Sequence, residues 1–236
     1  MKILSIDTSF SAVSVALTEN SEVLANFFIN AGLRHSITLM PMIDQLFKCS
    51  NERIEDIDLF AVSTGPGSFT GIRIGICTVQ GMSLALDKPC VGISSLHSLA
   101  VSAMLSTKDI FGVIICAMDA KCQRVYSAVF ENSKTGLTRK TNDCALTINE
   151  LVEFIDTHEG KIFLIGDAAE LCLSKIHNKN VALLNTSLNW RNFAIGIAKI
   201  SENMFLEGKS MNINKIRPSY VCVPKVQRNK NIVKDV

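Results

Sequence analysis

The sequence predicts an α/β protein of two lobes in tandem, each with the element order βββαβα. Residues 2–30 contain three short runs rich in β-branched and aromatic residues, followed by alternating helical and buried-strand patterns. The opening pattern recurs at 111–132, where an apolar run again ends in an aspartate, so that Asp119 takes the place of Asp7. Two similar lobes of this kind would face each other across a cleft.

The first half of the chain supplies the elements of one lobe. Polar turns at 8–11 and 19–21 separate the three strands, and a helix is predicted over 34–50 with Ser36 able to cap its start. Apolar residues at helical spacing support this helix and the next one: Leu39, Met42, Ile43 and Leu46, then Ile72, Ile76, Val79 and Leu86. The remaining elements are a buried strand in 58–68, a helix over 69–86, a strand over 89–95 and a helix over 96–105.

The second half supplies the other lobe. After 111–132 come a polar third strand near 137–146, a helix over 148–157, a strand in 161–170 and helices around 168–176 and 191–206. The expected domains are 1–107, 108–215 and a basic tail at 216–236, and one option for the last helix is to pack back on the first lobe.

Composition and charge exclude few function classes. The chain has 236 residues, 47% of them hydrophobic, and its formal net charge of +2 does not by itself indicate a nucleic-acid or membrane-surface protein. From Lys215 onward six basic residues stand against Asp235 alone. Such a tail can contact phosphate, although most tails of this kind are solvated.

The cysteines and the N-terminus indicate a cytoplasmic protein. The eight cysteines are scattered without a Cys-x-x-Cys pair, so we expect reduced packing residues. The chain enters a strand pattern directly after one lysine, which is not typical of a secretory leader. No stretch of about 20 residues is read as apolar enough to cross a bilayer.

The segment STGPGSFTGIRIG at 63–75 is the strongest local motif. It lacks the lysine of a Walker A loop, and its glycine spacing is not that of a dinucleotide-binding fingerprint. Two interpretations stay open. Backbone N–H groups at a helix start could bind an anion, with Gly65, Gly67, Ser68 and Arg73 as weak candidates. Alternatively, the glycines form a tight turn that lets backbones pack closely.

The two aspartates that end the first strand of each lobe could serve a nucleotide-cleaving site. A carboxylate there would orient a hydrated magnesium ion, with glycines in the turn to admit phosphates. Neither turn contains glycine, and Thr8 and Phe10 would crowd a triphosphate. We therefore favour a turn-capping role for Asp7 over a weak role in cofactor binding.

No catalytic or metal-ligating residue is predicted. The four histidines have no His-x-x-x-His or His-Glu-x-x-His spacing, so two imidazoles cannot share one helix face around a metal. No Gly-x-Ser-x-Gly nucleophile turn is present.

The predicted helix at 36–48 carries a second apolar stripe, formed by Ile37, Met40 and Phe47. One lobe can cover only one stripe, so the helix is either deep in the core or buries its second face against a partner. Gly71 and Gly75, four residues apart on the next helix, would let another backbone approach closely.

Several segments together resemble a known family. ILSIDTS, HSITLMPMID, STGPGSFTGIRIG, MDAKCQRVYSAVF and Pro-Ser-Tyr at 218–220 are similar to the bacterial tRNA threonylcarbamoyladenosine biosynthesis protein family TsaB, also called YeaZ. The resemblance spans nearly the whole chain. It implies an actin-like ATPase fold of two lobes and a non-catalytic role beside TsaD, a relative that holds its metal through a His-x-x-x-His helix.

The resemblance also implies partners. TsaD transfers a threonylcarbamoyl group to N6 of the adenosine next to the anticodon in tRNAs that read codons beginning with A. The N-terminal lobe would bind TsaD, or a second copy when TsaD is absent, through Ile37, Met40 and Phe47, with Gly71 and Gly75. TsaE would be the other partner. Nucleotide would bind among the assembled subunits and not to this chain as its own cofactor, and tRNA would be reached through the complex.

Two rival functions and two departures remain. The rivals are an ATPase of the sugar or acetate kinase type and a metallopeptidase. The family turn Asp-Ala-Arg-Arg-Gly-Glu-Val-Tyr has Gln123 and Arg124 here in place of Gly-Glu. The family ending Pro-x-Tyr-Leu-Arg becomes Pro-Ser-Tyr-Val-Cys, and Lys225 or Arg228 could substitute for its arginine.

Overall fold

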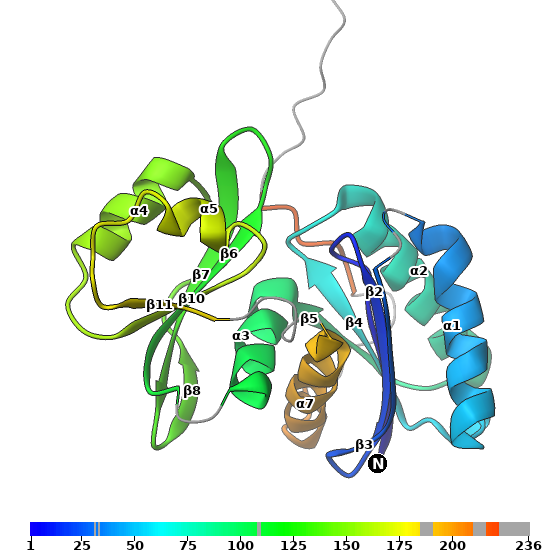
Figure 1. The fold of residues 1–236 in the computed structure, drawn as a ribbon. Helices are drawn as coiled ribbons and strands as arrows, with labels where there is room; N and C mark the ends of the chain where they lie inside the picture. The colour runs from blue at the N-terminus through cyan, green and yellow to red at the C-terminus, as the bar shows by residue number, and fades with distance from the viewer. Residues whose placement is uncertain (31, 33, 108–109, 185–190, 210–215, 222–236) are drawn as a thin grey trace, which may run out of the picture.

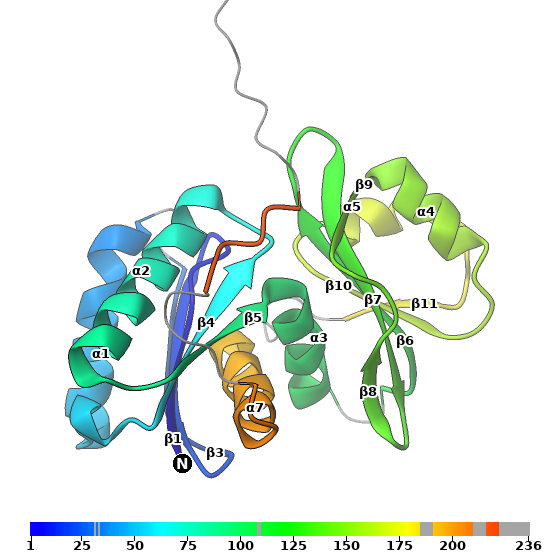
Figure 2. The same ribbon diagram turned by 180° about the vertical axis from the view of Figure 1, so that it is seen from behind.

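The computed structural model confirms the predicted α/β fold of two lobes (Figure 1). It describes residues 1–30, 32, 34–107, 110–184, 191–209 and 216–221. Five layers follow one another across the molecule: the pair α1 and α2, the first sheet, the pair α3 and α7, the second sheet, and the pair α4 and α5 (Figures 1 and 2). The described part of the basic tail, 216–221, lies on the first lobe, which corrects the prediction that the tail begins at 216.

The first sheet has the strand order β3-β2-β1-β4-β5. Its strands are β1 (Lys2–Asp7), β2 (Val13–Glu19), β3 (Glu22–Ile29), β4 (Leu59–Gly65) and β5 (Cys90–Ser94). The first three pair antiparallel, whereas β4 and β5 join parallel to β1, so β1 and β4 end at the same edge. Alternate residues of β1 face opposite layers: Leu4 and Ile6 pack under α1 and α2, and Ile3 packs towards α3 and α7.

Helices α1 (His35–Ser50) and α2 (Phe69–Leu86) cover the outer face of this sheet. Between α1 and β4 lies a short 3₁₀ turn, Ile54–Asp56. The predicted cap at Ser36 is wrong, because α1 begins one residue earlier and its cap position, Arg34, makes no side-chain cap bond. The helix start is held instead by the buried ring of His35, whose Nε2 lies 2.5 Å from the carbonyl oxygen of Phe10.

The second sheet repeats the first, with the order β11-β10-β6-β7-β8. Its elements are β6 (Gly112–Asp119), β7 (Arg124–Ser133), β8 (Gly136–Arg139), β9 (Cys144–Thr147), α4 (Ile148–Asp156), β10 (Ile162–Ile165), α5 (Ala169–Leu173) and β11 (Val181–Leu183). The predicted third strand at 137–146 is in fact two short strands, β8 and β9, which both pair with β7. Helix α4 begins with a capping box between Thr147 and Glu150.

One hydrophobic core joins the lobes. Helices α3 (Ser95–Ser106) and α7 (Phe193–Leu206) lie between the sheets, and the cluster around them contains residues of both, from Ile3 and Ile93 to Phe130 and Ile165. Phe193 meets Phe10 edge-to-face with ring centroids 4.9 Å apart. The Ser98 hydroxyl donates to the Phe193 carbonyl at 2.7 Å, which fixes α7 against α3.

Two predictions from composition need correction. Helix α2 is apolar and long enough to cross a membrane by length and composition alone, with a mean hydropathy of 1.3. In the structure it packs along the first sheet, where Ile72, Ile76 and Val79 are buried in the core beneath it. Not all cysteines are packing residues: Cys90, Cys116 and Cys172 are buried, but Cys49, Cys77 and Cys122 are exposed, and Cys222 is outside the described residues.

His97 of α3 forms part of the junction between the lobes. Its ring stacks on Phe130 of β7, with centroids 5.5 Å apart. Burial lowers the pKa of His97 from the usual 6.5 to about 4, and the Arg139 guanidinium acts in the same direction while Asp143 opposes it. The folded chain therefore holds a neutral imidazole down to mildly acidic pH.

This depressed pKa predicts how stability depends on pH. Between pH 6.5 and about 4 the unfolded chain binds a proton at His97 that the folded chain does not, so the free energy of unfolding falls as the pH falls. The loss from this group reaches up to about 3 kcal/mol. His97→Gln should flatten the decline in urea unfolding measured at stepped pH. Equal slopes for the parent and the variant would contradict the assignment.

Candidate functional site

The carboxylate of Asp7 is committed to the turn that follows β1. Asp7 is only 2% exposed. Its Oδ1 accepts from the Ser9 backbone N–H at 3.1 Å, from the Ser9 hydroxyl at 2.6 Å, and from the Ser63 hydroxyl of β4. Burial raises the pKa of Asp7, and the hydrogen bonds from Ser63 and Ser9 oppose the rise. This carboxyl group caps its own turn and ties β1 to β4.

The same turn packs directly against the glycines of the loop and of α2. A side chain at Gly71 would collide with the Thr8 carbonyl oxygen, and one at Gly75 with the Thr8 hydroxyl. A side chain at Gly67 would collide with the Ser9 carbonyl oxygen. Gly71 and Gly75 do allow close packing, but against the chain's own first turn. Both are buried, which corrects their prediction as residues of a partner interface.

The chain also covers the opposite side of the loop. Residues 216–221, which we call the strap, cross the carboxyl end of β4. Ile216 is buried in the first-lobe core, and the Ser219 N–H donates to the Thr64 carbonyl at 2.7 Å. A Cβ at Gly65 would lie 2.8 Å from the Ser219 carbonyl oxygen. The glycine loop is therefore closed between the first turn and the strap.

The first N–H groups of α2 are partly used within the chain. Ser68 is the cap residue: its hydroxyl accepts from the Gly71 N–H at 3.2 Å, and its own N–H donates to the Ser9 carbonyl at 2.7 Å. An anion at the helix start would compete with these bonds. The geometry supports the tight-turn interpretation of Gly65, Gly67 and Ser68.

Arg73 lies on the outer side of α2 and engages aromatic rings. Its guanidinium stacks 3.8 Å from the centroid of Phe69, and its Nε donates to the Tyr220 hydroxyl at 2.8 Å. Phe69 and Tyr220 are themselves stacked, with centroids 5.0 Å apart. Arg73 thus anchors the end of the strap to α2.

The equivalent turn of the second lobe is built differently. Asp119 ends β6 and accepts from the backbone N–H and the ammonium group of Lys121. Although partial burial favours the neutral form, these bonds hold the pKa of Asp119 below its usual value. Residues 121–123 all have positive φ, including 59° at Gln123. The left-handed conformation raises the conformational energy of each such residue by about 1–2 kcal/mol, so this turn is strained.

The second apolar stripe of α1 is only partly exposed. Ile37 is 66% and Met40 51% exposed, whereas Phe47 is half-buried and packs against the first-lobe core. Neighbouring α2 adds Phe69 and Leu84, which are 42% and 74% exposed. We call these four exposed residues, Ile37, Met40, Phe69 and Leu84, the outer helix face. Phe47 does not belong to it, because it packs against the first-lobe core, which corrects its prediction as a partner-contact residue beside Ile37 and Met40.

Sequence patterns missed three residues that close the loop: Ser9, Ser63 and Ser219. Only Ser9 gave a local signal, since a serine two residues after an aspartate is typical of an Asx turn. Ser63 and Ser219 reach the site through tertiary contacts alone. Within the part of the chain that the structure describes, no three His, Cys, Asp or Glu residues gather in a group that could hold a metal ion.

The fold of this chain is similar to that of proteins of known structure. The chain superimposes on YeaZ from Pseudomonas aeruginosa with a TM-score of 0.79 at 24% identity, covering 93% of this chain and 99% of that one. It also matches the inorganic polyphosphate/ATP-glucomannokinase from Arthrobacter sp. strain KM, with a TM-score of 0.51 at 9% identity, covering 84% and 99%. The fold is that of the actin-like ATPases and sugar kinases.

Comparison of sequences gives the family. Residues 22–215 match the sequence model of a protein family, which is described as TsaD, tRNA N6-adenosine threonylcarbamoyltransferase. The TsaB protein of Escherichia coli is 29% identical over 222 residues, which is 94% of each chain. That of Buchnera aphidicola subsp. Schizaphis graminum is 34% identical over 166 residues, 70% of this chain and 78% of its relative. The chain belongs to the TsaD family and, within it, to the TsaB (YeaZ) proteins of tRNA threonylcarbamoyladenosine biosynthesis.

The close packing at Gly71 predicts a sharp contrast between two glycines of α2. Gly71→Ala should lower the free energy of unfolding by about 3 kcal/mol, because the new methyl group meets a backbone oxygen. Gly81→Ala, on the same helix with nothing within 4 Å, should raise it by about 0.5–1 kcal/mol. Urea unfolding of both variants checks this. Similar effects at the two positions would refute the closed packing.

Proposed function

We propose that this chain is a non-catalytic scaffold and activator subunit of the machinery that makes threonylcarbamoyladenosine in tRNA. It binds the catalytic subunit TsaD, together with TsaE, and is required for modification of N6 of the adenosine next to the anticodon in tRNAs that read ANN codons. Membership in the TsaB family supports the pathway. The match to the TsaD family model supports a paralogous partner.

The closed glycine loop is the observation that carries the non-catalytic part of this proposal. An ATPase of this fold needs a carboxylate free to orient hydrated magnesium and a loop open to phosphate. Here Asp7 is buried and bonded to Ser9 and Ser63, and the loop is packed from both sides. Opening it would require both the first turn and the strap to move.

The outer helix face supports the partner-binding part. Large, partly exposed apolar side chains on two neighbouring helices favour burial against another protein. TsaD is the proposed occupant, and a second copy of this chain takes its place when TsaD is absent. Nucleotide binds among the assembled subunits, and tRNA is reached through the complex.

The proposal predicts the effect of a charge on the outer helix face. Met40→Asp should weaken both self-pairing and TsaD binding by about 2 kcal/mol or more, roughly thirtyfold, because an unpaired carboxylate would be buried in an apolar contact. The monomer should stay folded, since Met40 is 51% exposed. Sedimentation and titration with purified TsaD measure the two affinities.

The matched control is Gln45→Asp, which places the same charge on an exposed position of the same helix. It should leave both affinities within about twofold of the parent. Unchanged binding by Met40→Asp would remove the outer helix face from the interface.

The rival functions have direct tests. Magnesium-dependent ATP hydrolysis by the isolated chain, abolished by Asp7→Ala, would establish the kinase-like rival. Stoichiometric zinc or iron in the purified chain, with peptide cleavage, would establish the metallopeptidase.

A further inference from the structure

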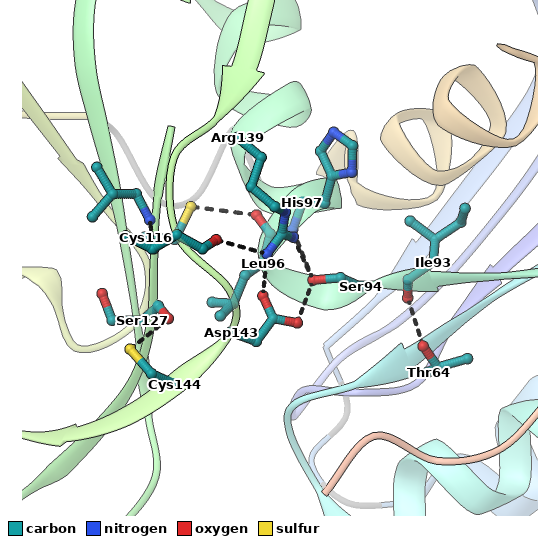
Figure 3. Close-up of polar contacts among 12 residues, drawn as sticks. Thr64, Ile93, Ser94, Leu96, His97, Cys116, Ser127, Arg139, Asp143 and Cys144 are labelled. Atoms are coloured by element: carbon teal, nitrogen blue, oxygen red, sulfur yellow. Dashed lines mark hydrogen bonds and ion pairs between the residues drawn. The ribbon is translucent and has the colours of Figure 1, made fainter. Parts of the chain in front are cut away.

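The two lobes also meet through a polar contact at the carboxyl end of β5, where Ser94 pairs with Gly65 of β4. Figure 3 shows Arg139, the last residue of β8, and Asp143, in the connection to β9, pointing towards Ser94 at the start of α3. We call these three residues the inter-lobe latch. None of them was singled out by the sequence patterns.

The latch is a closed ring of hydrogen bonds. Arg139 donates from Nη1 to Asp143 Oδ1 at 2.7 Å and from Nη2 to Ser94 Oγ at 3.0 Å. The Ser94 hydroxyl donates to Asp143 Oδ2 at 2.8 Å. The guanidinium therefore spans a carboxylate of its own lobe and a hydroxyl of the other, a geometry that needs two donors fixed in one plane.

Ser94 uses its full bonding capacity in this position. A hydroxyl has one proton to donate and two lone pairs to accept with. The proton goes to Asp143, and the lone pairs accept from Arg139 and from the backbone N–H of His97 at 3.2 Å. Because the last of these bonds caps α3, one oxygen connects the ion pair of the second lobe to the first turn of the helix between the sheets.

The surroundings favour a strong interaction. The side chains of Arg139 and Asp143 are 27% and 13% exposed, so solvent screens them less than a pair on the open surface. The guanidinium also lies 4.7 Å from the ring centroid of Phe130, the ring on which His97 stacks. Arg139 is thereby held in one orientation by a charge, a hydroxyl and an aromatic face.

The inter-lobe latch adds directional bonds to the apolar contact between the lobes. Hydrophobic burial holds the lobes together, but it is not directional. Hydrogen bonds of defined length between Ser94 and the pair Arg139–Asp143 restrict rotation of one lobe relative to the other.

We propose that Ser94, Arg139 and Asp143 are positioning residues that fix the angle between the two lobes. A complex whose contacts extend from the outer helix face to the second lobe would find both surfaces already set and lose less conformational entropy on assembly. This use of the latch rests on the proposed scaffold function, whereas its effect on the lobes does not.

Conservative substitution at Arg139 tests the latch in the chain alone. Arg139→Lys retains the ion pair with Asp143, but one ammonium group cannot also reproduce the planar bond to Ser94. Amide hydrogen exchange at residues 95–99, in the other lobe, should become about tenfold faster, as expected for loss of a charged hydrogen bond. X-ray scattering should show a broader distribution of interatomic distances.

Two controls separate the latch from general loosening. Lys140→Met removes a neighbouring exposed ion pair with Glu131 and should leave exchange at 95–99 unchanged. Ser94→Ala also removes the cap of α3, so it is compared with Thr147→Ala, which removes only the cap of α4. A double-mutant cycle of Ser94→Ala with Arg139→Lys should show strong non-additivity in exchange at 95–99.

Exchange at 95–99 that is unchanged in Arg139→Lys, or equal in Arg139→Lys and Lys140→Met, overturns the proposal. Partner binding is measured separately by titration with TsaD. Loosened lobes with parental TsaD affinity would refute the benefit to binding and keep the latch. Failure of the parent chain to bind TsaD would refute the scaffold function and leave the exchange result standing.

Discussion

The close contact between the first turn and the backbone of α2 is the constraint on which the rest of the structure depends. Thr8 and Ser9 occupy the space that side chains at Gly67, Gly71 and Gly75 would need. This contact holds α2 close to the sheet and covers the side of the glycine loop that faces the first turn. It also leaves Asp7 buried as a turn cap. The strap covers the opposite side of the glycine loop. The same packing that holds the lobe together supports the proposal that the loop is a structural turn and not a phosphate site.

The helices that join the lobes lie in a different layer from the helices that carry the outer helix face. Helices α3 and α7 are enclosed between the sheets and join the lobes in one core, with the inter-lobe latch at its edge. Helices α1 and α2 lie on the outside, and their exposed apolar residues are available to a partner. Binding can thus take place on the outer helix face without disturbing the contacts that set the lobes.

Local periodicity predicted the helices and strands well, but it did not predict the tertiary contacts that hold them. The predicted bounds of α2, 69–86, match the structure, and the predicted repeat of the first lobe matches most of the order of elements along the second. The cap of α1 was wrong because the His35 ring, bonded to a distant carbonyl, fixes the helix start. Gly71 and Gly75 signalled close packing, but no pattern named Thr8 as the contact. The strap has no periodicity, so its position depends on contacts with Thr64 and Gly65 that the sequence does not display.

The scaffold account is tested most directly by reconstitution with the cognate TsaD and TsaE, a threonylcarbamoyl donor, ATP and tRNA. The quantity measured is threonylcarbamoyladenosine formed per tRNA when each protein is left out in turn. The account predicts product with all components, none with this chain alone, and a loss of product when this chain is omitted. Modification by this chain without TsaD, or an undiminished yield in its absence, would contradict it.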